Sequence, residues 1–291
     1  MENPLISVVI PTYKRKINIV ARAVYSVLFQ TYKNFEIIVV DDSPSDYIDS
    51  KFIERFLMEL NDSRIKYVKH NVNKGANVAR NTGIKKSRGK YIAFLDDDDQ
   101  WLPTKLQKQL KMFDSPCVAM VYNPYYVYHK ERIKVKKILK SGYLFRDLLY
   151  SNFIGSTSCV MLDKKKLLEV GLFNETLPAS QDYELYLRIS KKNIINFVDE
   201  PLVIYHEHNG ERISSNPYKK LLARKYIYEK YNKSIKKYPW INSEKNLQIA
   251  HSYSQNKNFK MKWKHWYSAI LAHPNYSNKL LKYTFILLLN K

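Results

Sequence analysis

Short apolar runs alternate with helical stretches through the first hundred residues, and this alternation constrains the fold more than any other feature of the chain. Four short runs are rich in apolar side chains, which is typical of buried strands: residues 5–10, 35–40, 65–68 and 91–95. The segments between them are predicted to be helices: residues 17–30, 48–60 and 76–86. Strands that alternate with helices form right-handed βαβ units. The sequence therefore predicts an α/β fold with a Rossmann-like, mixed but mostly parallel sheet flanked by helices.

Length and composition set the scale of the molecule. The chain has 291 residues, of which 45% are hydrophobic, and a mass of 34.6 kDa. These values indicate one large domain or a domain with an appendage, and they exclude a disordered chain. Residues 1–4 lack the basic segment of a signal peptide, and the apolar run 285–289 is far shorter than a membrane span, so we expect a cytoplasmic protein. Cys117 and Cys159 lack metal-ligand spacing, which suits a reducing compartment.

Basic residues outnumber acidic residues by 49 to 27, which gives a net charge of +22. This sign favours acidic partners such as phosphates, nucleic acids or an anionic membrane. The excess is concentrated near the end of the chain, because residues 217–291 contain 16 lysines or arginines, two glutamates and 14 of the 40 aromatic residues. The sequence therefore predicts two parts: an α/β domain over residues 1–215 and a basic, aromatic-rich region of α-helices over residues 216–291.

Four consecutive aspartates follow the predicted strand 91–95, and we name residues 96–99 the aspartate run. Adjacent carboxylates repel one another, and their oxygens suit Mg²⁺ or Mn²⁺ bridging to substrate phosphates. The alternative is an acidic loop that caps a helix beginning near Pro103. Ligands of parallel sheets bind beyond the carboxyl ends of the strands. Other polar segments are expected at the same edge, which favours the metal: Pro11-Thr12-Tyr13, Asp41-Asp42 and Asn73-Lys74-Gly75.

Asp41, Asp42 and Arg80 each have a binding interpretation and a simpler one. Asp41 and Asp42 can hydrogen-bond a base or ribose, although Asp-Asp-Ser-Pro is also good turn chemistry. Arg80, near the start of a predicted helix, can contact phosphate or base, although an arginine in that position is usually solvated. The chain lacks both the G-x-G-x-x-G fingerprint and the P-loop, which disfavours a dinucleotide oxidoreductase and a P-loop enzyme.

A second group of chemically active residues lies between 180 and 212. Asp182 falls in the first turn of a predicted helix, where it either complements the helix dipole or acts as a general base for a hydroxyl nucleophile. His206 and His208 alternate at a predicted strand end, so both rings point one way, toward a metal or a diphosphate. Arg212 follows in a polar segment.

At this point the sequence resembles family 2 glycosyltransferases of the GT-A fold, over about residues 4–215. Five stretches carry the resemblance, in the order and spacing of that family: SVVIPTY (7–13), SVLFQTY (26–32), FEIIVVDDS (35–43), NKG (73–75) with ARNTGI (79–84), and GKYIAFLDDDDQW (89–101). Each stretch alone is weakly specific, but the five together are specific.

The resemblance implies a donor site for a nucleoside-diphosphate sugar, with UDP the commonest nucleotide in the family, and bound Mn²⁺ or Mg²⁺. The implied donor-nucleotide contacts are Pro11, Thr12, Tyr13, Asp41, Asp42, Arg80, Asp96 and Asp97. Asp96 and Asp98 match the ends of the D-x-D motif, with Asp98 as the direct metal ligand and His206 or His208 as a loosely matched further ligand. Asp182 matches the catalytic base, preceded by Gln181 where many members have glutamate. Further implied contacts with the phosphates or the acceptor are Trp101, Gln181 and Arg212.

The implied reaction is a single in-line displacement with inversion at the anomeric carbon, and a glycan or lipid-linked hydroxyl as acceptor. The family association suggests synthesis of capsule or another bacterial surface polysaccharide. The C-terminal region is predicted to contain helices at 218–237, 247–254, 261–272 and 279–289. These helices either cap the α/β domain or form a surface that binds an anionic membrane or the acceptor. In the second case we expect the protein at the inner face of the cell membrane. The main alternative is a non-catalytic polyanion-binding protein, although no nucleic-acid motif is present and nucleic acid is not an expected partner.

Overall fold

The computed structural model describes residues 3–129, 132–206 and 216–274 of the chain. They divide into two compact units. The first unit comprises Met1–Phe145, Phe153–Glu175 and Leu185–Asn209, and the second comprises Arg146–Asn152, Thr176–Glu184 and Gly210–Lys291. No helix in the described ranges combines the length and the apolar character that crossing a bilayer requires. The predicted boundary between residues 215 and 216 remains a prediction.

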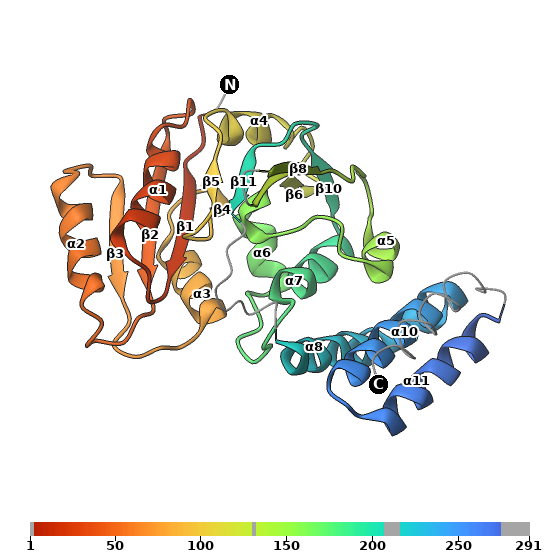
Figure 1. Cartoon of the computed structure of the whole chain (residues 1–291). Coiled ribbons are helices and arrows are strands. Elements are labelled where there is room, and N and C mark those ends of the chain that lie inside the picture. Colours follow the sequence, from red (N-terminus) through yellow and green to blue (C-terminus); the bar gives the residue numbers. More distant parts are fainter. Residues whose placement is uncertain (1–2, 130–131, 207–215, 275–291) are drawn as a thin grey trace. The chain divides into compact units, whose positions relative to one another are not determined.

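The first unit is built on a seven-stranded sheet with the strand order β10-β6-β9-β4-β1-β2-β3 (Figure 1). Its strands are β1 (Ile6–Thr12), β2 (Phe35–Asp41), β3 (Ile65–Lys69), β4 (Tyr91–Phe94), β6 (Val118–Tyr122), β9 (Val160–Asp163) and β10 (Ile194–Phe197). All neighbouring pairs are parallel except those of β9, which runs antiparallel to both β4 and β6. The predicted fold, α/β with a mostly parallel sheet, is confirmed.

Helices cover both faces of this sheet, so β1, β2 and β4 are buried on both sides. The helices of the first half are α1 (Ile17–Leu28), α2 (Asp49–Glu59), α3 (Ala76–Lys86) and α4 (Lys105–Lys111). One core joins α1 and α2 to Ile6, Val8 and Ile10 of β1 and to alternate residues of β2. On the opposite face, Ala79 of α3 packs against Ile38 and Val40 of β2. Odd-numbered and even-numbered residues of the apolar runs face opposite sides of the sheet, and both sets are buried, as a parallel sheet requires.

Strand β1 continues through Pro11 to Thr12, whereas the sequence predicts that Pro11 closes it. The ladder explains why proline is tolerated. β4 pairs with β1 only from Ile6 to Val9, so on that side no strand needs the amide hydrogen that Pro11 lacks. On the other side the ladder to β2 continues until Thr12 meets Asp41.

Gly83 lets α3 approach β1 closely. A Cβ atom at this position would lie 2.2 Å from Cγ1 of Val9, closer than two carbon atoms can pack. We expect Gly83→Ala to lower the free energy of unfolding by about 1–3 kcal/mol, because overpacking outweighs the better helix propensity of alanine. Denaturant titration measures this, with Lys85→Ala on the exposed side of the same helix as control. Equal stabilities of the two variants would contradict the tight packing.

Lys105 is fully buried at the start of α4. Its Nζ donates to Oε1 of Gln109 across 2.7 Å and lies 3.9 Å from the ring centroid of Trp101. Burial lowers the pKa of Lys105 from 10.5 to about 7. The unfolded chain therefore binds more protons than the folded one between pH 7 and 10.5, so this group makes stability rise with pH across that range.

We expect Lys105→Met to remove this rise, on the order of 5 kcal/mol across the range. Denaturant titrations at several pH values test this, with Lys111→Met, an exposed position of the same helix, as control. If wild type and Lys105→Met keep parallel stability curves from pH 7 to 10.5, the lysine is not held neutral by burial.

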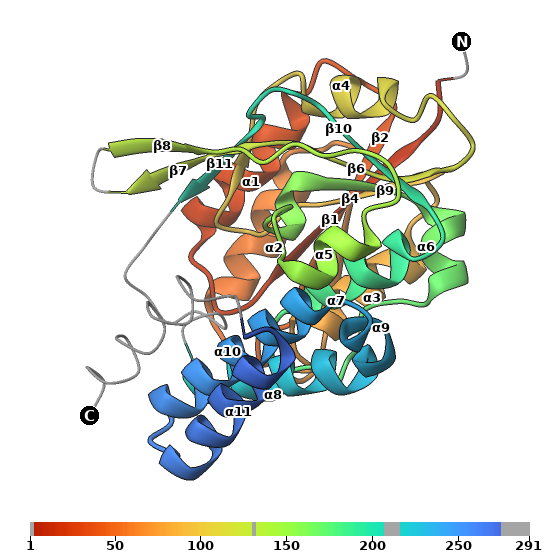
Figure 2. The ribbon, with the colours of Figure 1, turned by 90° about the vertical axis from the view of Figure 1, so that its right-hand side faces the viewer.

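A second, four-stranded sheet in the first unit has the order β5-β11-β7-β8. Its strands are β5 (Gln100–Trp101), β7 (Tyr125–His129), β8 (Arg132–Lys136) and β11 (Val203–His206), and Figure 2 shows the last three running side by side. β5 follows the aspartate run directly and pairs with β11. This sheet therefore adjoins the candidate site.

Between residues 216 and 274, which the structure describes, the second unit contains four helices: α8 (Pro217–Lys230), α9 (Asn232–Lys236), α10 (Pro239–Gln255) and α11 (Phe259–Ala272). The single helix predicted over 218–237 is wrong, because the chain leaves helical geometry at Tyr231. α10 begins eight residues before the predicted helix 247–254, at Pro239, which suits a first helical turn. The predicted helix 279–289 lies outside the described residues.

Candidate active site

The polar residues predicted at strand ends come together at one edge of the central sheet. β1, β2 and β4 are parallel neighbours, so their carboxyl ends meet there. The amide of Asp42 donates to the carbonyl of Thr12 across 2.9 Å, which joins the ends of β1 and β2. The guanidinium of Arg15, three residues after β1, reaches the aspartate run after β4. Residues from three separate strand ends therefore form one candidate site.

The four carboxylates of the aspartate run differ in exposure. The side chains of Asp96 and Asp98 are 28% and 20% exposed, whereas Asp97 and Asp99 are buried. The amide of Asp99 donates to the carbonyl of Asp96 across 3.0 Å and closes a turn. Within the run, the ends of the D-x-D pattern are thus the carboxylates that solvent and a ligand can reach.

Two arginines that the sequence patterns did not single out hold the aspartate run. Arg15 donates from Nε to Asp97 across 2.9 Å and from Nη2 to Asp98 across 2.6 Å. Arg22 of α1 donates from Nη2 to the backbone carbonyl of Asp98 across 2.6 Å. These positive charges offset the repulsion among adjacent carboxylates.

Asp96 is held by a different set of partners. Nη2 of Arg80 lies 2.6 Å from Oδ1 of Asp96, and the hydroxyls of Ser156 and Thr157 donate to the same carboxylate at 3.1 and 3.2 Å. Burial alone would raise the pKa of Asp96, but the charge and hydrogen bond of Arg80, with the two hydroxyls, bring it below its ordinary value. Asp96 is therefore ionised at neutral pH, and Arg80 lies at the predicted site through this contact.

The pKa values of the two buried carboxylates, Asp97 and Asp99, shift in the opposite direction. Burial raises the pKa of Asp97 to about 7, against the opposing charge of Arg15. Burial and the charges of Asp96 and Asp98 raise the pKa of Asp99 well above its ordinary value, and the hydroxyl of Ser158 donates to Asp99 across 2.6 Å. The run therefore combines an ionised carboxylate, Asp96, with two buried ones, Asp97 and Asp99, that readily hold a proton.

The ends of β1 and β2 form the other side of the site. Asp42 is buried and accepts from the amides of Lys74 and Gly75 at 2.9 and 2.7 Å, while Nδ1 of His70 lies 2.7 Å from its Oδ1. Asp41 is buried as well and accepts from the hydroxyl of Tyr67 across 2.8 Å. Both carboxylates thus organise the backbone of this edge, including the predicted Asn-Lys-Gly segment.

The segment after β1 presents Tyr13 to solvent. Tyr13 is 43% exposed, whereas Pro11 and Thr12 are buried. The next residue, Lys14, has a φ of 48°, which is uncommon for a residue other than glycine. Its amide donates to the hydroxyl of Ser43 across 2.8 Å. Strained backbone of this kind often marks a functional segment.

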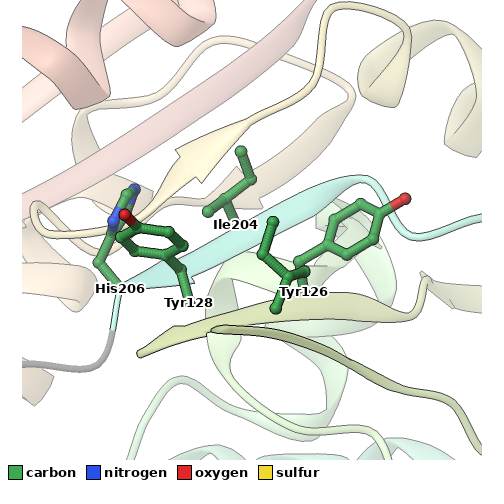
Figure 3. A pocket seen from close by; sticks show the side chains of 5 residues that line it. Tyr126, Tyr128, Ile204 and His206 are labelled. Carbon is green, nitrogen blue, oxygen red and sulfur yellow. The ribbon is translucent and has the colours of Figure 1, made fainter. Parts of the chain in front are cut away.

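Trp101 and His206 belong to the second sheet, in β5 and β11. Trp101 is 2% exposed, and its Nε1 donates to the carbonyl of Ser158 across 2.9 Å, so its indole supports the site from the core. His206 ends β11 and lies across from Tyr128, with ring centroids 5.7 Å apart. Both rings line a cavity of about 340 Å³ on the second sheet (Figure 3), whose further lining residues are Tyr126, Ile133 and Ile204. His208 and Arg212 lie outside the described residues.

Asp182 lies in the second unit, within the first turn of α7 (Gln181–Ser190), as the sequence predicts. Gln181 begins this helix, and Ser180 before it has a φ of 55°. Two residues on, the buried Glu184 forms an ion pair of 2.7 Å with Lys230 of α8. The first turn of α7 is thus fixed to the C-terminal helices by a contact that no sequence pattern indicated.

The carboxylates of the first unit suit a hard divalent cation. In the described part of the chain, no three His, Cys, Asp or Glu side chains converge as a metal cage. Mg²⁺ is typically bound by one or two carboxylates and completes its shell with water and substrate phosphates. The two exposed carboxylates, Asp96 and Asp98, match that donor set.

Comparison with known proteins agrees with this arrangement. Residues 7–171 match the model of the family described as glycosyl transferase family 2. WfgD of Escherichia coli, named UDP-Glc:alpha-D-GlcNAc-diphosphoundecaprenol beta-1,3-glucosyltransferase, is 34% identical over 76% of this chain and 84% of its own. WcaA of Escherichia coli strain K12, named a putative colanic acid biosynthesis glycosyl transferase, is 33% identical over 81% of this chain and 86% of its own.

A solved structure shows the same fold. Residues 1–349 of Staphylococcus aureus TarS, crystallised with UDP-GlcNAc, superimpose with a TM-score of 0.63, covering 91% of both chains at 15% sequence identity. The family model spans more than half of the chain, and the Escherichia coli relatives exceed 30% identity over most of their length. The chain therefore belongs to glycosyltransferase family 2 and is a glycosyltransferase of the GT-A fold.

Proposed function

We propose that this glycosyltransferase moves a sugar from a UDP-sugar, with inversion and with the help of Mn²⁺ or Mg²⁺, to a hydroxyl of a lipid-linked or other glycan acceptor during bacterial surface-polysaccharide synthesis. The observation that carries the proposal is the pair of partly exposed carboxylates, Asp96 and Asp98, at the shared edge of β1, β2 and β4. The alternative of a non-catalytic polyanion-binding protein is wrong, since the chain belongs to a family of enzymes.

The similar proteins support the substrate classes. WfgD carries UDP-Glc and a diphosphoundecaprenol-linked acceptor in its name, WcaA is named for colanic acid biosynthesis, and TarS was crystallised in complex with UDP-GlcNAc. A lipid-linked acceptor lies in a membrane. We therefore propose that the protein acts in the cytoplasm at the inner face of the cell membrane.

Each site residue has a proposed task. Asp98 and Asp96 hold the cation, which, when bound, offsets negative charge on the diphosphate leaving group. Arg15 and Arg22 keep the aspartate run in place through their contacts with Asp97 and Asp98. Tyr13 lies against the nucleoside, next to buried Pro11 and Thr12, and the edge organised by Asp41 and Asp42 completes its pocket.

Asp182 is the proposed general base, which takes the proton from the attacking acceptor hydroxyl. Its place in the first turn of α7 and the strained backbone at Ser180 support this role. Gln181, Arg212 and His208 are proposed contacts of phosphates or acceptor. For His206, the cavity that it shares with Tyr128 favours acceptor contact over metal binding.

The test is a donor screen that records UDP release and sugar transfer to a lipid-linked GlcNAc diphosphate acceptor, with Mn²⁺, with Mg²⁺ and with EDTA. The proposal predicts transfer from one UDP-sugar, with an inverted anomeric centre, and loss of transfer in EDTA that added metal restores. Transfer that is insensitive to EDTA, or a product with retained configuration, contradicts the proposed mechanism.

A further inference from the structure

Helix α11 presents an apolar stripe to solvent. Phe259, Trp263, Tyr267 and Leu271 follow one another at intervals of four residues, so they lie along one side of the helix. They are 46%, 39%, 58% and 64% exposed. We name these four residues the α11 stripe. Large apolar side chains gathered on one exposed face generally mark a binding surface, whereas scattered ones do not.

The rest of α11 already has its packing partners within the second unit. Ala269 is buried, and Trp266 and Ile270 pack with it against Leu247 of α10. Nζ of the buried Lys262 lies 5.2 Å and 4.9 Å from the ring centroids of Phe259 and Trp263. The ammonium group of Lys262 thus lies beside both rings. The stripe is therefore additional to the core of the unit.

Positive charge surrounds the stripe. Lys260 and Lys264 are exposed, each directly following a residue of the stripe. Residues 217–274 contain 13 lysines or arginines against Glu229 and Glu244, a net charge of +11. A helix with aromatic and aliphatic residues on one side and lysines beside them is typical of segments that lie in a membrane interface. Tryptophan and tyrosine favour that boundary because their rings are apolar with one polar group.

We infer that the α11 stripe, with Lys260 and Lys264, docks the protein on an anionic phospholipid surface. The stripe enters the interfacial layer and the lysines meet the headgroups. The inference deepens the proposed function and rests on it in one respect, since a lipid-linked acceptor requires access to a membrane. A second copy of the chain is a poorer occupant, because the lysines of two copies would repel each other. Nucleic acid would match the lysines but leave Leu271 in water.

The experiment measures binding to acceptor-free vesicles of phosphatidylcholine with and without phosphatidylglycerol, by co-sedimentation. We expect the wild type to bind the phosphatidylglycerol vesicles preferentially. Replacing Trp263, Tyr267 and Leu271 together by glutamine is expected to weaken that binding about a hundredfold, since three apolar side chains no longer leave water. Lys260→Gln with Lys264→Gln is expected to weaken it about fivefold per lysine. The control pair is Phe52→Gln with Met58→Gln on α2, which are 51% and 68% exposed and should leave binding unchanged.

A second readout locates the contact. Brominated phosphatidylglycerol should quench tryptophan emission of the wild type, and Trp263→Phe should remove most of that quenching. All replaced side chains are exposed, so thermal midpoints should stay within a few degrees of wild type.

The outcomes that overturn the inference are distinct. They are a wild type that does not bind phosphatidylglycerol vesicles, a stripe variant that binds like wild type, or a loss of binding in the α2 control pair. Self-association in sedimentation velocity that the stripe variant abolishes would assign the stripe to a second copy instead. Transfer to a short, water-soluble acceptor should be equal in wild type and stripe variant. If no variant consumes a UDP-sugar while vesicle binding behaves as expected, the proposed function fails and the docking surface stands.

Discussion

Asp98→Asn is expected to lower kcat for sugar transfer by about a thousandfold, the effect of losing several kcal/mol of charge stabilisation by the cation. The substitution keeps the shape of the side chain and removes its charge. Because Asp98 is partly exposed and its ion-pair partner Arg15 retains Asp97, the fold should persist. Initial rates at saturating donor measure the effect, and a Mn²⁺ titration should show a much weaker apparent affinity for the metal.

The matched control is Asp62→Asn. Asp62 is 22% exposed and forms an ion pair of 2.6 Å with Arg64. Asp62→Asn therefore makes the same chemical change at similar exposure, but outside the candidate site. We expect full activity in this variant. If Asp98→Asn retains more than a tenth of wild-type kcat with unchanged metal dependence, Asp98 does not hold the cation.

Asp182→Asn is expected to lower kcat by about a hundredfold to ten-thousandfold, the usual contribution of a general base, and to leave donor affinity unchanged. The reason is that the acceptor hydroxyl would lose its proton acceptor while the nucleotide pocket stays intact. Single-turnover transfer with preloaded donor measures the chemical step, and titration with UDP measures binding.

The competing role of Asp182 is to complement the dipole of α7. Asp147 provides the control, because it stands in the first turn of α5 (Phe145–Tyr150). A dipole role predicts that Asp182→Asn and Asp147→Asn both lower stability slightly and spare kcat. A general base predicts a loss of kcat in Asp182→Asn alone. Equal kcat in the two variants would therefore remove Asp182 from the catalytic machinery.

Local patterns predicted the first half of the fold well. The predicted helix 76–86 coincides with α3, and the four predicted strands match β1, β2, β3 and β4 within two residues. These elements succeed because strands buried on both faces appear as continuous apolar runs. β9 could not be predicted from a local apolar run in this way. Its place between β4 and β6, antiparallel to both, depends on long-range pairing that no local pattern encodes.

The sequence predicted the carboxylates of the site but not the residues that hold them in place. The exposure of Asp96 and Asp98 follows from the turn that Asp99 closes, and the sequence identified the motif but not the turn. Arg15 precedes α1 and Arg22 lies within it, and 76 to 83 residues separate them from the aspartates that they bind, so no local pattern connected them with the run. Nothing local pointed to Ser156, Thr157 and Ser158, which meet the aspartates from about 60 residues away.

The order of assembly has a consequence for synthesis of the chain. When a ribosome has released β1 to β4, the aspartate run already exists, but the hydroxyls that bond Asp96 and Asp99 belong to residues 156–158. β9 follows within two residues and inserts between β4 and β6. Until these residues have emerged, the nascent N-terminal half therefore has an open sheet edge at β4, and Asp96 and Asp99 lack the hydroxyls that bond them in the folded chain. Non-local pairing of this kind is slow and prone to aggregation, so we expect nascent chains that end between residues 100 and 155 to aggregate more readily than the full chain.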